Sequence, residues 1–196
     1  MAWTIEGMAL SSGEAIRWPV FALVAYISGP LGSFLNRLRA ELVPSYHLFS
    51  HLTLLPPRPV KAPERAILKH LEARISQTPV FDVELGDVEI FPVTSVIYLS
   101  VLVGRGPVES IHDHLNQRLL AFDEPFEFQP HVTLAQEVEP ENLLAAYAMA
   151  RQRWERWRGP RTFTVEKLTL VRNGGPDVWT TLSEYQLGCA NLLKTV

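Results

Sequence analysis

The sequence has little of several features that would each have pointed to a particular class of protein. A single cysteine, Cys189, excludes a disulfide within the chain and is typical of the reducing cytoplasm. The apolar run 20–27 is far shorter than the roughly 20 residues that a membrane-spanning helix needs. The first 18 residues lack the basic start and continuous apolar stretch of a secretory signal. We therefore expect a cytoplasmic protein without membrane association.

An excess of positive charge is also absent. Lysine and arginine number 18 against 21 acidic residues, which gives a net charge of −3. Tight binding to long nucleic acid depends on neutralising many phosphates, so DNA is not an expected partner. A small anionic substrate needs only a local cluster of donors. Glycine-rich phosphate loops are missing, because Gly174-Gly175 lies in an expected turn with no helix after it. With 196 residues, 47% of them hydrophobic and 20% charged, the chain fits one globular domain, expected to be a monomer.

The chain contains an internal repeat. The motif His51-Leu52-Thr53-Leu54 returns as His131-Val132-Thr133-Leu134, an offset of 80 residues (131 − 51). Two further matches occur in the same order: Pro63-Glu64 with Pro140-Glu141, and the segment 81–84 with 163–166. Three matches at nearly equal spacing indicate a duplication, with pseudo-repeats at about 19–91 and 94–188.

Hydrophobic periodicity predicts an α+β fold from this duplication. We expect strands at both His-x-Thr segments, the first stopped by Pro56-Pro57, and at 20–27, 81–85, 96–103, 162–171 and 179–187. Helices are expected near 31–42, 63–76, 108–119 and 143–154. The predicted structure is bilobal and pseudo-two-fold symmetric, with two antiparallel sheets that face a central cleft, helices on the outside, and residues 92–95 connecting the lobes.

The two His-x-Thr motifs carry the predicted chemistry. On a strand, residues i and i+2 share a face, so each histidine projects together with its threonine. A hydroxyl donates to a phosphoryl oxygen, and an imidazole exchanges a proton near neutral pH. If the lobes are opposed, His51 and His131 meet across one groove. One ring would take a proton from the attacking oxygen and the other would protonate the leaving oxygen, without a metal.

A single His-x-Thr is common and is usually structural. Two copies at equivalent points of a widely diverged duplication favour the catalytic interpretation, in which Thr53 and Thr133 stabilise charge on the non-bridging oxygens.

At these residues the chain resembles the 2H phosphoesterase superfamily, which includes bacterial RNA 2′,3′-cyclic phosphodiesterases, also called 2′-5′ RNA ligases. The resemblance runs from about Pro19 to Leu187 and includes both motifs, the strand-like segment 95–101 and a closing hairpin formed by 165–172 and 179–187. It implies a bilobal fold with both motifs lining the cleft. It also implies an acid role for His51 and a base role for His131. The implied substrate is a small nucleotide or an RNA terminus that carries a cyclic phosphate, or a 2′-5′ linkage, with no cofactor.

The chain departs from the RNA-processing branch beside both motifs. That branch often continues its second motif with a basic residue, where this sequence has Ala135-Gln136. Arg58, between two prolines, is either a replacement phosphate contact or an arginine at the surface. Tyr98 either stacks on a nucleobase in the cleft or packs against a helix. We include Arg58, Gln136 and Tyr98 as candidate substrate-binding residues.

Other functions remain open at this stage. A binding module that kept the anion site but lost catalysis is the main alternative, and a zinc hydrolase that uses His51 and His131 is a weaker one. His112 and His114 are two residues apart on an expected helix and so do not face each other, which favours helix-surface or half-buried positions over a metal site. The segment 151–158 mixes arginine with tryptophan; a helix end with Trp154 and Trp157 in the core is favoured over a base-stacking platform.

Overall fold

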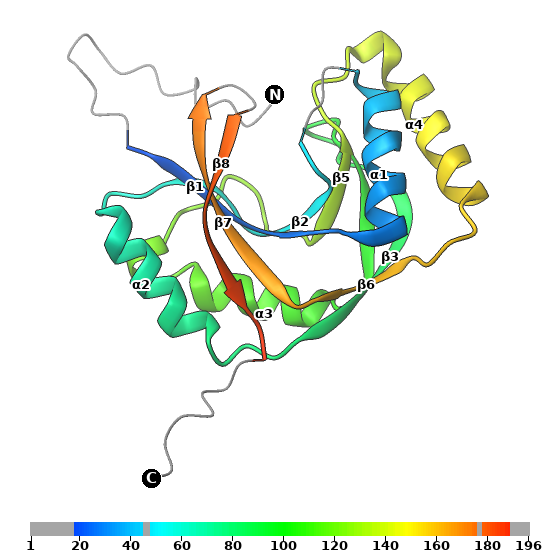
Figure 1. Cartoon of the computed structure of the whole chain (residues 1–196). Helices are drawn as coiled ribbons and strands as arrows, with labels where there is room; N and C mark the ends of the chain where they lie inside the picture. Colours follow the sequence, from blue (N-terminus) through cyan, green and yellow to red (C-terminus); the bar gives the residue numbers. More distant parts are fainter. Residues whose placement is uncertain (1–17, 45–47, 176–177, 189–196) are drawn as a thin grey trace, which may run out of the picture.

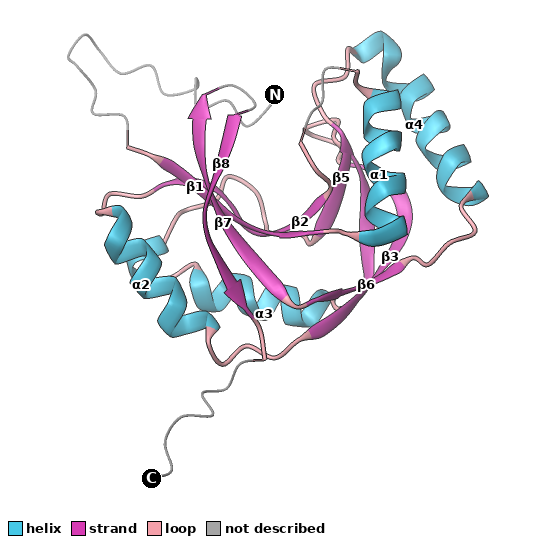
Figure 2. Cartoon of the chain, viewed as in Figure 1, coloured by secondary structure: helices cyan, strands magenta, loops and turns pink. Residues whose placement is uncertain are grey.

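A computed structural model of the chain describes residues 18–44, 48–175 and 178–188, so Cys189 lies outside the described residues. Its strands form two four-stranded antiparallel sheets, which we call sheet A and sheet B (Figures 1 and 2). Sheet A has the order β2-β1-β7-β8 and consists of β1 (Val20–Tyr26), β2 (His51–Pro59), β7 (Lys167–Gly175) and β8 (Val178–Gln186). Sheet B has the order β5-β4-β3-β6 and consists of β3 (Phe81–Ile90), β4 (Ile97–Val103), β5 (His131–Ala135) and β6 (Thr162–Val165). The α+β prediction is confirmed.

Two helices cover the outer face of each sheet (Figure 1). Their bounds are α1 (Gly29–Leu42), α2 (Glu64–Ile75), α3 (Arg105–Leu115) and α4 (Pro140–Arg156), and a short 3-10 turn (Arg118–Leu120) follows α3. Helices α1 and α4 pack on each other and on sheet B, whereas α2 and α3 pack on sheet A. Each helix buries an apolar stripe, as Leu31, Leu35 and Leu38 do in α1. Among the described residues, no helix is both long and apolar enough to cross a membrane.

The two sheets exchange strands between the halves of the chain. Strand β3 belongs to the first half in sequence but lies in sheet B, and β7 and β8 belong to the second half but lie in sheet A. The repeat segment 81–84 pairs with residues 162–165, which overlap its matching segment 163–166, and Val83 lies opposite Phe163. The prediction that residues 92–95 connect the lobes is wrong, because β3 and β4 are neighbours in sheet B and these residues form the turn between them. The chain crosses between the sheets at 76–80 and at Glu166 instead.

Three strands differ from their predicted bounds by more than one residue, and the first of them, β3, continues to Ile90 instead of ending at residue 85. The expected strand 162–171 divides at Glu166 into β6 in sheet B and β7 in sheet A, a break that local sequence does not encode because it comes from the crossing between sheets. Strand β2 does not stop at Pro56-Pro57 but continues to Pro59. Since β2 is an edge strand, a proline without an N–H group costs no sheet hydrogen bond on its unpaired side.

Candidate active site

Both His-x-Thr motifs lie at the edges where the two sheets approach each other. His51 and Thr53 are at the start of β2, the edge strand of sheet A, and His131 and Thr133 are at the start of β5, the edge strand of sheet B. Strands β2 and β5 contact each other. The intervening Leu52, Leu54, Val132 and Leu134 are completely buried, whereas the four polar side chains are half-buried. The alternation of the two strands therefore turns the polar members of both motifs away from the core.

The two imidazole rings are fixed in the same way. Nδ1 of His51 lies 2.7 Å from the carbonyl oxygen of Phe49, and Nδ1 of His131 lies 2.7 Å from the carbonyl oxygen of Gln129. A carbonyl oxygen only accepts hydrogen bonds, so Nδ1 of each ring must carry a hydrogen and donate it. In the neutral form Nε2 is then the unprotonated nitrogen. Each motif thus presents one basic nitrogen from a ring whose orientation is set by the backbone two residues earlier.

Burial makes both rings weaker bases than an exposed histidine. Burial, with smaller contributions from the charges of Arg39 and His131, lowers the pKa of His51 to about 4, although the hydrogen bond to Phe49 opposes the shift. Burial also lowers the pKa of His131, against the hydrogen bond to Gln129. In the substrate-free protein at pH 7 both rings are therefore neutral.

The threonines complete two matched pairs. Each threonine has a partner on the neighbouring strand of its own sheet: Thr53 is opposite Val24 of β1, and Thr133 is opposite Tyr98 of β4. Among the described residues, neither threonine hydroxyl takes part in a hydrogen bond. Two hydroxyls and two imidazole nitrogens are thus available at adjoining edges of the sheets, which is a set of groups suited to the oxygens of a phosphodiester.

An aromatic wall supports His131. The ring of Tyr98 is stacked on Phe91 with centroids 3.9 Å apart, and both rings meet His131 edge-on, at 5.4 and 5.0 Å. The Tyr98 hydroxyl donates to Glu89 at 2.8 Å and accepts from the side chain of Gln129 at 3.2 Å. Burial, followed by the bond to Glu89, raises the pKa of Tyr98 to about 12. Tyr98 thus packs against Phe91 and His131, and with 3% of its surface exposed it offers no open ring face to a base.

Different neighbours surround His51. Tyr26 is its cross-strand partner and meets the ring edge-on, with centroids 6.1 Å apart. Arg39 of α1 is buried and its charge acts on the ring. One turn earlier on the same helix, Asn36 accepts a hydrogen bond of 2.7 Å from the backbone N–H of Ser50. Sequence reasoning missed Arg39, Gln129, Phe91 and Glu89, because only the packing of α1 and the strand register bring them to the site.

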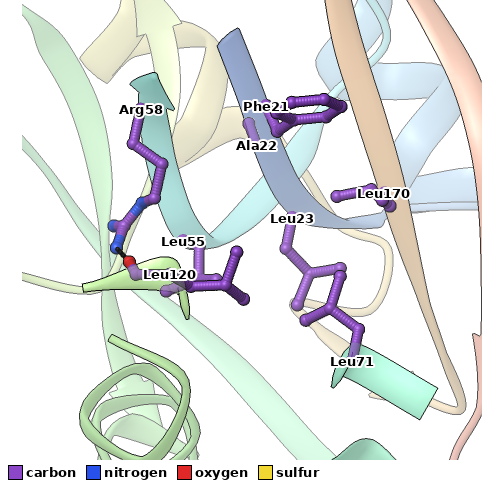
Figure 3. Close-up of a pocket in the computed structure, with 8 residues that line it drawn as sticks. All are labelled: Phe21, Ala22, Leu23, Leu55, Arg58, Leu71, Leu120 and Leu170. Atoms are coloured by element: carbon purple, nitrogen blue, oxygen red, sulfur yellow. Dashed lines mark hydrogen bonds between the residues drawn. The ribbon is translucent and has the colours of Figure 1, made fainter. Parts of the chain in front are cut away.

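Arg58 does not belong to this site. Arg58 is in β2, where it pairs with Phe21 of β1. Its side chain is on the helix-covered face of sheet A and is 1% exposed. Its guanidinium donates to Asn116 at 2.7 Å, to the carbonyl oxygens of Leu120 and Pro56 at 3.0 Å each, and to Glu124. Figure 3 shows Arg58 and its bond to Leu120 beside a small cavity with apolar walls. The predictions of a phosphate contact and of a surface arginine are both wrong, because the prolines do not end β2 and Arg58 continues its buried face.

The remaining candidates have plain structural positions. Gln136 directly follows β5 and is half-buried. His112 is buried and His114 exposed, as expected for residues on different faces of a helix. Trp154 lies in the core and donates to the carbonyl of Gly86 at 2.8 Å, while Trp157 stacks on Phe34. Within the described parts of the chain, no three His, Cys, Asp or Glu side chains gather so that they could hold a metal ion.

Comparison with known proteins gives a consistent family and fold. The model of the 2′-5′ RNA ligase superfamily matches residues 28–177. The structure is similar to E. coli LigT complexed with 3′-AMP (19% identity, TM-score 0.63, 87% of this chain and 99% of that chain). It is also similar to TT0787 of Thermus thermophilus (18%, 0.58, 86% and 97%) and to Usb1 of Kluyveromyces marxianus (13%, 0.51, 85% and 98%). Among curated proteins, no sequence matches the chain.

Proposed function

The chain belongs to the 2′-5′ RNA ligase superfamily, and we propose that it is a metal-independent phosphodiesterase that opens 2′,3′-cyclic phosphodiesters or cleaves 2′-5′ linkages. Membership supports phosphoesterase chemistry in general. The specific proposal of a two-histidine phosphodiesterase rests on the matched pair of bonds from Nδ1 of His51 and His131 to backbone carbonyls. Those bonds leave Nε2 of each ring to exchange a proton with substrate.

The proposed reaction needs one neutral ring and one charged ring. Nε2 of the base takes a proton from water, whose oxygen bonds to phosphorus. The phosphorus–ribose oxygen bond then breaks, and the charged ring donates its proton to the departing oxygen. Both rings are neutral in the substrate-free protein. The proton that charges the acid ring therefore has to be taken up when the substrate binds. A bound phosphate anion favours it, because a nearby negative charge raises the pKa of an imidazole.

Electrostatics support His51 as the base. The charge of Arg39 acts on His51, whereas burial alone lowers the pKa of His131. When a phosphate binds between the rings, the added proton is therefore favoured on His131. With His51 as the base and His131 as the acid, this assignment is the opposite of the one that the family resemblance implies. Because the two motifs are nearly equivalent, the roles also exchange when the reaction runs in reverse.

A substrate panel tests the proposal. Purified protein is incubated with 2′,3′-cyclic nucleotides, RNA ends that carry a cyclic phosphate, and 2′-5′ dinucleotides, all with EDTA present. We expect turnover of at least one class. Gln136, which stands where the RNA-processing branch often has a basic residue, motivates the alternative of a nucleotide-binding module. Binding of a nucleoside 2′-phosphate without turnover of any member of the panel would establish that alternative.

A further inference from the structure

Arg58, Glu124 and His112 form a buried charged cluster on the helix-covered face of sheet A. Arg58 is near the end of β2, His112 is in α3, and Glu124 lies in the segment 121–130 that leads to β5. One oxygen of Glu124 accepts from both Arg58 and Nε2 of His112, the latter at 2.9 Å. All three side chains are buried. The cluster thus fastens the segment 121–130 to β2 and α3.

His112 is held in its charged form by this geometry. Its Nε2 faces Glu124 at 2.9 Å, and its Nδ1 faces Asp113 at 3.0 Å. Carboxylates accept hydrogen bonds, so both ring nitrogens must carry hydrogen when both bonds are made. Burial opposes the charge and Arg58 repels it, but the bonds to Glu124 and Asp113 outweigh them and raise the pKa of His112.

The ring of His112 also holds the segment that enters β5. It lies parallel to the ring of Phe128, with centroids 3.8 Å apart and planes inclined by 3°. An imidazolium over an aromatic face adds an electrostatic attraction to the packing. Phe128 precedes Gln129, whose carbonyl orients His131 and whose side chain donates to Tyr98. A continuous series of contacts therefore runs from His112 through Phe128 and Gln129 to His131.

In the part of the chain that the structure describes, the first motif has no equivalent support. Phe49, whose carbonyl orients His51, has an exposed side chain, and the backbone beside it is held by the bond from Ser50 to Asn36. Within the described ranges, His131 alone is thus connected to a buried ionisable cluster through the residue that orients it.

We propose that His112 is a positioning residue for His131, acting through Phe128 and Gln129, so that its charge state regulates the geometry of the second motif. The proposal rests on the proposed function only for its kinetic consequence. Above its own pKa, His112 can donate to one carboxylate only, and the attraction to Phe128 weakens. The segment 121–130 then loses part of its attachment, and the Gln129 carbonyl no longer fixes His131 as firmly.

His112→Phe tests the proposal, with His114→Gln as a matched control on the exposed side of the same helix. The first readout needs no substrate: NMR of the imidazole nitrogens reports the tautomer and the pKa of His131. We expect His112→Phe to lose the uniform Nδ1-protonated tautomer of His131 and to leave His51 unchanged, whereas His114→Gln has no effect. The second readout is turnover, for which kcat should fall roughly 10-fold to 100-fold with little change in KM, as small misplacements of catalytic groups do.

Phe128→Leu provides a second route if His112→Phe does not fold, because it removes the stacked ring and leaves the ion cluster intact. It should change the His131 resonances in the same way. His131 resonances that stay as in the native protein, in a folded variant of either kind, would overturn the proposal and leave His112 a purely structural residue. Altered His131 resonances in a protein that turns over none of the panel would instead count against the proposed function alone.

Discussion

The carbonyl oxygen of Gln129 lies 2.7 Å from Nδ1 of His131 and determines which nitrogen of that ring is basic. Phe49 stands in the same relationship to His51. A histidine that must exchange a proton with a substrate gains from such a bond in two ways. The bond selects the tautomer, and it fixes the plane of the ring before substrate arrives. Both rings have such a bond, in each case from the residue two positions earlier, so the two motifs match in local structure as they do in sequence.

Replacing either histidine by alanine should abolish turnover without unfolding the protein. Positioned proton transfer contributes roughly 10²-fold to 10⁴-fold for each group, so His51→Ala and His131→Ala should each lose at least that factor in kcat. Circular dichroism and thermal melting serve as the control for folding. Native turnover in either folded variant would end the two-histidine mechanism.

Removal of metal ions should leave activity unchanged, because the proposed acid and base are protein side chains. The measurement is kcat with and without EDTA, after dialysis against the chelator. Activity that is lost in EDTA and restored by zinc would instead favour a metal-assisted reaction.

The pH optimum of kcat/KM should lie on the acid side of the ordinary imidazole pKa of about 6.5. The base must be neutral, so the rate rises as pH increases through the pKa of His51, about 4. The acid must be protonated, so the rate falls as pH increases through the lowered pKa of His131. A bell-shaped profile results.

Arg39→Met tests what sets the acid limb of the pH profile of kcat/KM. Without that charge the pKa of His51 should increase, and the acid limb should move to higher pH. Arg37→Met, an exposed arginine of the same helix, should leave the profile as it is. An acid limb that does not move in Arg39→Met would count against His51 as the base.

Arg58→Met should destabilise the fold by roughly 3 kcal/mol, because the buried Glu124 then keeps only His112 as a cationic partner and its charge is incompletely compensated. The free energy of unfolding, measured with urea, provides the test. The double variant Arg58→Met, Glu124→Gln removes the stranded charge and should recover much of the loss. A single variant as stable as the native protein would mean that Glu124 is not held by Arg58.

Tyr98→Phe should separate packing from substrate contact. The substitution keeps the stacked ring and removes a hydroxyl with two hydrogen-bond partners, so we expect a loss of about 1 kcal/mol in stability. Where the same hydroxyl contacts also position Gln129 and His131 in the transition state, a loss of about 1 kcal/mol there lowers kcat by about fivefold. Tyr147→Phe, which loses one bond to the carbonyl of Val88, is the matched control. An increase in KM at unchanged kcat would point to direct contact with substrate.

The sequence by itself determined most of the secondary-structure elements and which residues are candidates for the chemistry. Each motif alternates fully buried Leu or Val with half-buried His or Thr, and this alternation follows from the period of two in a strand. The leucine stripe of α1 follows equally from helical periodicity. These patterns are local, so they can be read from neighbouring residues. The repeat adds one non-local fact, namely that the two motifs occupy equivalent places.

Only the tertiary structure decided which half contributes to which sheet and which residues support the two rings. Arg39 is 12 positions before His51, and Phe91 is 40 positions before His131; helix packing and strand register bring them together, and neither leaves a pattern in the sequence. Arg58 shows the same limit, because its place between prolines suggested an arginine at the surface, whereas the packing of α3 on β2 and the bond to Glu124 decided its burial. Periodicity acts over a few residues, whereas the environment of an ionisable group depends on every segment that packs around it.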